Sequence, residues 1–217
     1  TIKFSLLFPH WLSGTRPLSN SVADIFPTAI ESPRIRFTFR DEETSQTFNG
    51  WVVRKERYVY GLKDWYEQNG IIPGSLITIS RSEKPGEILI HSERSRQNKE
   101  WMKTVLIGAD KGIVFAMLKH PVDVDFNERM TIAIPDVESV DLVWQEREKV
   151  NVEKTCMQIA RELAKLNPQG HIHAQEMYAA INVIFRCPPT PVLNFLLTNS
   201  NIQHLGDLYF HLKEGAN

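Results

Sequence analysis

The stretch from Asn49 to Ile90 constrains the fold more than any other part of the chain. It reads NGWVVRKERYVYGLKDWYEQNGIIPGSLITISRSEKPGEILI. Two runs rich in Val, Tyr and Trp, at residues 51–54 and 57–60, are typical of strands. A short helix carrying Trp65 follows, and residues 76–90 alternate like a hairpin across a Pro-Gly turn. This order predicts a small, mostly-β domain with short helices.

The flanking sequence extends this domain in both directions. Residues 1–32 are interpreted as an irregular lead-in with a short helix near residues 21–25. The alternation Ile35-x-Phe37-x-Phe39 predicts a strand with one buried face. Residues 102–134 continue in strands around a hairpin turn at 109–112, and Pro135-Asp136 begins a helix.

The pattern becomes helical after a polar segment at residues 145–151, which we interpret as a linker. One apolar stripe comprises Val152, Cys156, Ile159, Leu163 and Leu166. A short strand, two further helices and a closing hairpin follow. Helix, strand, helix, helix and hairpin is the order of a winged helix. We therefore expect an α+β chain with a pseudobarrel at 1–148 and a winged-helix domain at 149–217.

Composition permits two folded domains and gives weak information about partners. The chain has 217 residues, 42% of them hydrophobic and 24% charged, and no apolar run approaches a membrane span. Its opening residues lack the pattern of a secretory signal, and a start at Thr1 is compatible with a segment of a larger protein. Cys156 and Cys187 lie in apolar surroundings, which favours buried thiols in a reducing, cytoplasmic setting over a disulfide. Residues 33–103 hold thirteen Lys or Arg against ten Asp or Glu, an excess of three.

The motif string in the first domain resembles the B-three family of plant auxin- and abscisic-acid-response factors. The same fold recurs in the recognition domains of some restriction enzymes. The resemblance covers roughly residues 15–95. It rests on an arm Thr15-Arg16-Pro17-Leu18-Ser19, a helix end Phe26-Pro27, a strand Trp51-Val52-Val53, a second arm Arg54-Lys55-Glu56-Arg57, a helix Gly61-Leu62-Lys63-Asp64-Trp65 and a turn Ile72-Pro73-Gly74-Ser75.

In that family the two arms grip the major groove of duplex DNA. Arginine forks donate pairs of hydrogen bonds to guanine edges or phosphates, and short polar side chains complete the surface. The resemblance therefore implies DNA contacts by Arg16, Ser19, Asn20, Arg54, Lys55 and Arg57. The chain departs from the family in two places, because its second arm is shorter and Ser75 replaces an acidic turn residue.

The last segment resembles the HARE type of winged helix. The whole chain resembles bacterial proteins of the Chloroflexi type with the same two-part layout. A winged helix usually reads DNA with its third helix, and the polar groups on and near that helix are Arg186, Thr190, Asn194 and His204. The helix itself, at residues 190–198, has no Lys or Arg. This domain is therefore equally open to binding a protein partner or forming a homodimer.

The sequence offers little for catalysis. His171 and His173 have the spacing of some metal ligands, but no further ligand follows at a suitable distance. Residues 136–149 combine acidic residues with a lysine, yet Arg147 occupies the position where a restriction-type nuclease needs an acid. Trp101, with Arg94, Arg96, Lys99 and Lys103 beside it, is a candidate for base stacking.

We therefore predict a cytoplasmic, non-enzymatic protein without a metal or cofactor that binds double-stranded DNA, as a regulator or as the recognition part of a larger assembly. The alternative left open is a protein-interaction scaffold that does not bind DNA. An enzyme using the histidines is a third, weaker option.

Overall fold

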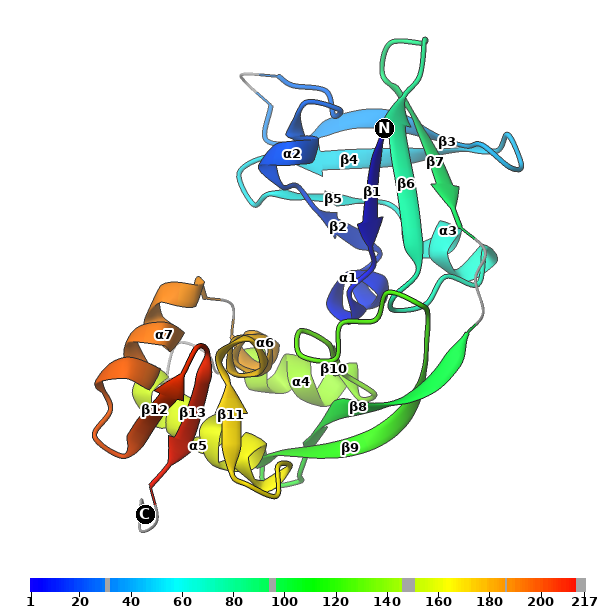
Figure 1. The fold of residues 1–217 in the computed structure, drawn as a ribbon. Helices are drawn as coiled ribbons and strands as arrows, with labels where there is room; N and C mark the ends of the chain where they lie inside the picture. Colours follow the sequence, from blue (N-terminus) through cyan, green and yellow to red (C-terminus); the bar gives the residue numbers. More distant parts are fainter. Residues whose placement is uncertain (30–31, 94–96, 146–150, 186, 214–217) are drawn as a thin grey trace. The chain divides into compact units, whose positions relative to one another are not determined.

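The chain forms two compact units (Figure 1). The computed structural model describes residues 1–29, 32–93, 97–145, 151–185 and 187–213. Unit 1 comprises Thr1–Glu100 and Pro121–Asn127, and unit 2 comprises Trp101–His120 and Glu128–Asn217. The division expected after residue 148 falls inside unit 2, because the helix before it packs on the C-terminal helices. The Trp144 Nε1 atom donates to the Val183 carbonyl at 2.6 Å.

Unit 1 is built on a curled seven-stranded sheet in the order β1-β6-β7-β3-β4-β5-β2. All neighbouring strands are antiparallel except β3 and β7, which are parallel. The bounds are β1 Ile2–Ser5, β2 Thr15–Pro17, β3 Ile35–Asp41, β4 Thr47–Val53, β5 Tyr58–Tyr60, β6 Leu76–Arg81 and β7 Glu87–Ser92. The strands predicted between residues 35 and 90 are confirmed.

Aromatic rings fill the inside of this sheet. The alternation in β3 turns Phe37 and Phe39 inward, and Phe26 packs edge-on against Phe37 with a centroid distance of 5.3 Å. Gly50 lies opposite Phe37 in β4, and a Cβ atom there would come within 2.6 Å of the Phe37 ring. A glycine is therefore required at this point so that the two phenylalanines can pack against the strand.

The lead-in, residues 1–32, is more ordered than predicted. It contains β1, helix α1 (Phe8–Ser13), β2 and helix α2 (Asn20–Ala23). The prediction failed because β1 has only four residues and is fixed by its partner β6, where Ile2 pairs with Ile79. Such an element depends on a contact distant in sequence, which a local pattern does not reveal.

Helix α3 (Lys63–Gln68) closes one end of unit 1 as the sequence predicted. The Trp65 indole donates to Asp41 Oδ2 at 2.6 Å in a buried contact. Burial acts to raise the pKa of Asp41. Hydrogen bonds from the Thr44 and Glu43 backbone and from Trp65 outweigh this effect and hold that pKa below its usual value.

A long ribbon is formed by β8 (Asn98–Ile107) and β9 (Ile113–Val122), which are joined by the predicted turn; its residues 101–120 belong to unit 2. The Gly108 amide donates to the Gly112 carbonyl across that turn at 2.8 Å. A short strand, β10 (Ile132–Ala133), pairs in parallel with β8. Helix α4 (Val137–Gln145) follows, with Asp136 accepting from the Ser139 amide at its start.

The C-terminal elements follow the predicted order. They are α5 Val152–Lys165, β11 His171–His173, α6 Ala174–Ile184, α7 Pro189–Thr198, β12 Ile202–Gly206 and β13 Tyr209–Leu212. The strands form a sheet in the order β11-β13-β12. Cys156, Ile159 and Leu163 of the predicted stripe are buried in one core with α6 and α7. Of the linker predicted at residues 145–151, Gln145 ends α4 and Asn151 caps α5, and residues 146–150 lie outside the described residues.

Both cysteines are free thiols, and burial raises the pKa of Cys156 to about 12. Among the helices described above, none is long and apolar enough to cross a membrane.

Candidate nucleic-acid interface

The two arms predicted from the sequence lie side by side in unit 1. Strand β2 pairs with β5, so that Arg16 lies opposite Val59. The Leu18 amide donates to the Arg57 carbonyl at 2.9 Å, and Arg57 Nη2 donates to Asn20 Oδ1 at 2.6 Å. Figure 1 shows α2 beside the β4–β5 hairpin. Residues nearly forty positions apart therefore form one surface.

The turn between β4 and β5 presents its cations to solvent. Lys55, Glu56 and Arg57 are exposed. The Arg57 amide donates to the Arg54 carbonyl at 3.2 Å, and Arg57 adopts a left-handed backbone with φ of 56°. A side chain in that conformation costs about 1 kcal/mol relative to glycine. The fold thus retains a cation where glycine would be easier to accommodate.

Arg54 is half-buried, and its side chain is directed at backbone carbonyls next to helix α2. Its guanidinium donates to the carbonyls of Ala23, Phe26 and Pro27 at 2.9–3.4 Å. These carbonyls lie at the end of α2 and just beyond it. Arg54 therefore holds the second arm against the end of α2 and the segment after it, which follow the first arm in the chain.

Arg16 lies inside unit 1, with only 3% of its surface exposed. Its guanidinium sits 4.0 Å from the centre of the Phe4 ring, and its Nε and Nη1 atoms have no hydrogen-bond partner. Burial lowers the pKa of Arg16 to about 10, although Tyr66 acts in the opposite direction. The position follows from strand alternation, because Arg16 occupies the inward side of β2 next to the buried Val59.

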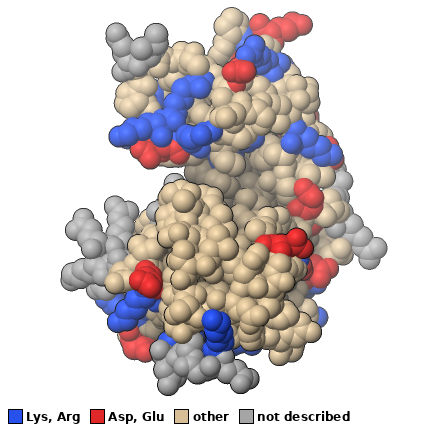
Figure 2. All heavy atoms as spheres, turned by 60° about the vertical axis from the view of Figure 1, so that its left-hand side comes forward, with Lys and Arg blue, Asp and Glu red and all other residues tan. Residues whose placement is uncertain are grey.

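The remaining predicted residues of the first arm are at the surface. Ser19 and Asn20 are both exposed, and the Ser19 and Ser21 hydroxyls are hydrogen-bonded at 2.9 Å. Figure 2 shows Lys and Arg side chains grouped on one face of the unit that carries the N-terminus, with Asp and Glu side chains at the border. Within the arms, Lys55 and Arg57 are the exposed cations and Glu56 is the exposed anion.

The turn at residues 72–75 has no acidic residue of its own but is contacted by the carboxylate of Asp123. Ser75 Oγ donates to Asp123 Oδ2 at 2.9 Å and accepts from the Ile72 amide at 3.1 Å. The Asp123 amide in turn donates to the Pro73 carbonyl at 2.8 Å. A carboxylate from a segment about fifty residues later therefore stabilises this turn. No local signal in the sequence pointed to Asp123.

The polar residues predicted on the third C-terminal helix carry no charge in the described part of the chain. Thr190 and Asn194 are exposed on α7, and Arg186 lies outside the described residues. His204 Nε2 is 2.9 Å from the Asp207 carbonyl in the β12–β13 turn. This surface can offer neutral hydrogen bonds but, over residues 189–198, no Lys or Arg.

The two histidines with the spacing of metal ligands have different surroundings. His173 is buried, and its Nδ1 accepts from the Gln175 amide at the start of α6. Burial lowers the pKa of His173, and the nearby Arg129 acts in the same direction. His171 instead lies edge-on to His211. Over the described residues, no three His, Cys, Asp or Glu side chains are grouped so as to hold a metal ion.

Trp101 is exposed on β8, with 57% of its surface accessible. Lys119 Nζ lies 5.3 Å from the centre of its ring. Of the four cations expected beside it, Arg94 and Arg96 are outside the described residues. Lys99 is exposed, and Lys103 is paired with Glu176 at 2.8 Å.

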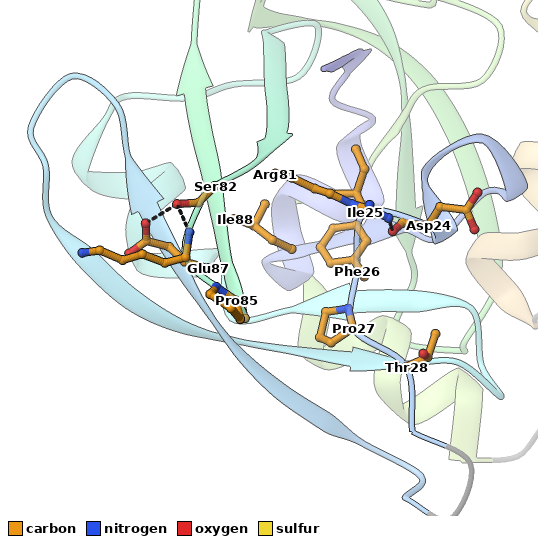
Figure 3. A pocket seen from close by; sticks show the side chains of 12 residues that line it. Asp24, Ile25, Phe26, Pro27, Thr28, Arg81, Ser82, Pro85, Glu87 and Ile88 are labelled. Atoms are coloured by element: carbon orange, nitrogen blue, oxygen red, sulfur yellow. Dashed lines mark hydrogen bonds between the residues drawn. The ribbon is translucent and has the colours of Figure 1, made fainter.

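A pocket of about 560 Å³ lies beside the first arm, between residues 24–28 and the β6–β7 turn (Figure 3). Ile25, Phe26 and Ile88 form its apolar part. On one side the Ser82 hydroxyl donates to Glu87 Oε1 at 2.6 Å. On the other, Arg81 donates to the Asp24 carbonyl. Phe26, which lines this pocket, also accepts a hydrogen bond from Arg54 through its carbonyl. The pocket therefore lies next to the segment that Arg54 holds.

Comparison with known proteins finds a partial structural likeness but no family or curated relative. No protein-family model matches the chain, and no curated protein matches it. A solved structure entitled "Arabidopsis FUS3-DNA complex" is similar to 44% of this chain and 97% of its own, with a TM-score of 0.36 and 14% sequence identity.

Proposed function

We propose that the chain binds duplex DNA through the paired arms of unit 1, which we interpret as a B-three-like pseudobarrel. The observation that supports this most directly is the β2–β5 pairing, which joins two polar loops into one surface with exposed cations. Lys55 and Arg57 neutralise phosphates, and Ser19 and Asn20 donate or accept neutral hydrogen bonds. Unit 2 ends in a winged-helix-like arrangement, and the protein acts by positioning, as a regulator or recognition module, rather than by catalysis.

The roles of the arginines within this proposal follow from their surroundings. Arg57 is the cation that contacts DNA, because it is exposed and the turn keeps it in a strained backbone conformation. Strain of this kind is often found at functional sites. Arg54 is a positioning residue that keeps the arms together, and Arg16 belongs to the interior.

The test is binding of a short DNA duplex, measured by fluorescence anisotropy across a salt series. Changing Lys55→Ala together with Arg57→Gly removes two cations while relieving the left-handed strain. We expect the slope of log K against log salt to fall by about 2 and the affinity near 0.1 M salt to fall by about 60-fold. Lys154→Ala with Lys165→Ala in unit 2 is the charge-matched control. Equal slopes for the wild type and the arm variant would reject the proposal.

A second candidate function is protein binding by unit 2. Leu197, Leu205 and Leu208 are exposed, with accessible fractions of 62%, 44% and 41%. Apolar side chains on and beside a helix that has no Lys or Arg over residues 189–198 suit a protein partner or a second copy better than a phosphate backbone. A stable oligomer in light scattering, without DNA retention at low salt, would favour this function over the first.

A further inference from the structure

The outer face of the sheet next to the arms carries a row of aromatic and basic side chains. Arg36 on β3 is paired with Trp51 on β4, and Trp51 is paired with Tyr60 on β5. Tyr60 is in turn paired with Thr15 on β2. Neighbouring positions in β4 and β5, such as Val52 and Val59, point into the core. The row therefore lies on the side of the sheet opposite the phenylalanine core.

Two rings of this row are stacked, and a third ring lies tilted beside them. The Trp51 and Tyr60 ring centres are 5.2 Å apart, and their planes are within 8° of parallel. Tyr58 lies 6.1 Å from Tyr60 on the same face. All three rings are half-buried. An aromatic pair of this kind has outer ring faces to which a further flat ring can be added.

The charge of this face suits a polyanion. Asp41 is the sole acidic residue in the described strands β2, β3, β4 and β5, and it lies on the inner side with Phe39. The outward positions of β3 include Arg36 and Arg40. Arg40 is paired with Glu87 of β7 at 3.0 Å, whereas Arg36 is exposed beside the stack.

We infer that this aromatic row stacks the unpaired bases of a DNA strand that leaves the duplex held by the arms. The inference rests on the proposed function. Bases within a duplex are already covered by their neighbours, so only unpaired bases expose ring faces to a protein. Tyr58 directly follows Arg57, and Tyr60 lies about 6–7 Å further along the strand, the length of about two stacked bases. The aromatic row therefore begins next to the second arm and continues away from it along β5.

The experiment compares two DNA molecules, a blunt duplex and the same duplex with a three-nucleotide single-stranded overhang at either end. One stacked base contributes about 1–3 kcal/mol, so we expect the overhang to tighten binding by at least about fivefold. Tyr60→Thr keeps a residue suited to a strand and removes the ring. It should abolish the gain while leaving blunt-duplex affinity unchanged. Tyr60→Phe, which retains the ring, should keep the gain.

Failure of this inference is distinguishable from failure of the proposed function. Lys55→Ala with Arg57→Gly should weaken both DNA molecules by the same factor, whereas Tyr60→Thr should affect only the overhang. If Tyr60→Thr does not fold, Arg36→Gln tests the same face without disturbing the stack and should also reduce the gain. Equal affinity of the wild type for both DNA molecules would overturn the inference. A gain that survives Tyr60→Thr but disappears in Trp101→Ala would also overturn it.

Discussion

The paired arms of unit 1 and helix α7 of unit 2 differ in what they can offer to DNA. The arms were expected to contact DNA from a motif string, whereas α7 was a candidate from its place in a helix–strand–helix–helix order and was equally open to a protein partner. The arms present Lys55 and Arg57 to solvent, whereas α7 presents Thr190, Asn194 and the apolar Leu197. The position of an element in a fold indicates where a contact is sterically feasible. Its charge decides whether a phosphate backbone is bound there.

A second difference lies in how each region is held. The arms are joined by the β2–β5 pairing, and Arg54 adds hydrogen bonds from the second arm to three carbonyls at and beyond the end of α2. Helix α7 is held by burial of Val192, Phe195 and Leu196 in its core. The Arg54 hydrogen bonds can be removed with a single substitution that leaves Lys55 and Arg57 in place. The geometry of the arms can therefore be tested separately from their charge.

The largest effect on stability is expected when the Arg54 hydrogen bonds are removed. Arg54→Met keeps the apolar stem but leaves the carbonyls of Ala23, Phe26 and Pro27 without their donor. Because charged hydrogen bonds contribute about 1.5–3 kcal/mol, the free energy of unfolding of unit 1 should fall by about 2–3 kcal/mol. Urea unfolding, with hydrogen exchange of peptides covering residues 15–23 and 54–60, measures the change.

The matched control is Arg34→Met, the same substitution at an exposed site, which should change stability by less than about 0.5 kcal/mol. DNA affinity should fall in Arg54→Met because helix α2, which carries Asn20, is then held less firmly beside the second arm. The salt slope should stay within about half a unit of the wild type, because no phosphate contact is lost. A slope lower by about one unit would instead make Arg54 a direct phosphate contact.

A smaller effect of opposite sign is expected at Arg16. Its buried guanidinium has two nitrogen atoms without hydrogen-bond partners, and replacing a buried charge by an apolar side chain of similar size is often stabilising. Arg16→Met should raise the free energy of unfolding by about 1–2 kcal/mol. Duplex affinity should change by less than about twofold. A loss of stability would show that the Arg16 guanidinium makes a stabilising interaction inside unit 1. A salt slope lower by about one unit would show that it contacts a phosphate.

The three arginines show what sequence alone could and could not predict. The order of strands and helices from residue 35 to 90 followed from alternation and turn residues, and the meeting of the two arms followed from the resemblance. The surroundings of the Arg16 and Arg54 guanidinium groups could not be predicted from either. Arg16 is inside because of its register against Val59, and Arg54 is directed inward because α2 ends beside it. Both depend on pairing between distant segments, which a local pattern does not encode.

The same reason explains the other differences. Strand β1 and the carboxylate of Asp123 are fixed by partners more than forty residues away. The stack of Trp51 on Tyr60 could be seen in sequence only as two separate aromatic residues in adjacent strands. In unit 2 the helices were predictable because the period of buried residues in α5 is local. The packing of α4 onto α6 was not, since it depends on tertiary contacts such as that of Trp144 with Val183.

The smallest effect is expected when charge is added to α7, and it tests the comparison between the two regions most strictly. Thr190→Lys with Asn194→Lys places two cations on one face of the helix, and Glu56→Lys changes the charge by the same amount in the second arm. If the arms hold the duplex, Glu56→Lys should tighten binding by about five- to tenfold, because one phosphate contact is gained. The α7 pair should change affinity by less than about twofold at the same salt concentration. Anisotropy titrations of all three proteins with one duplex measure both effects. A gain on α7 equal to that in the arm would show that both regions lie against the DNA, and charge alone would then not distinguish them.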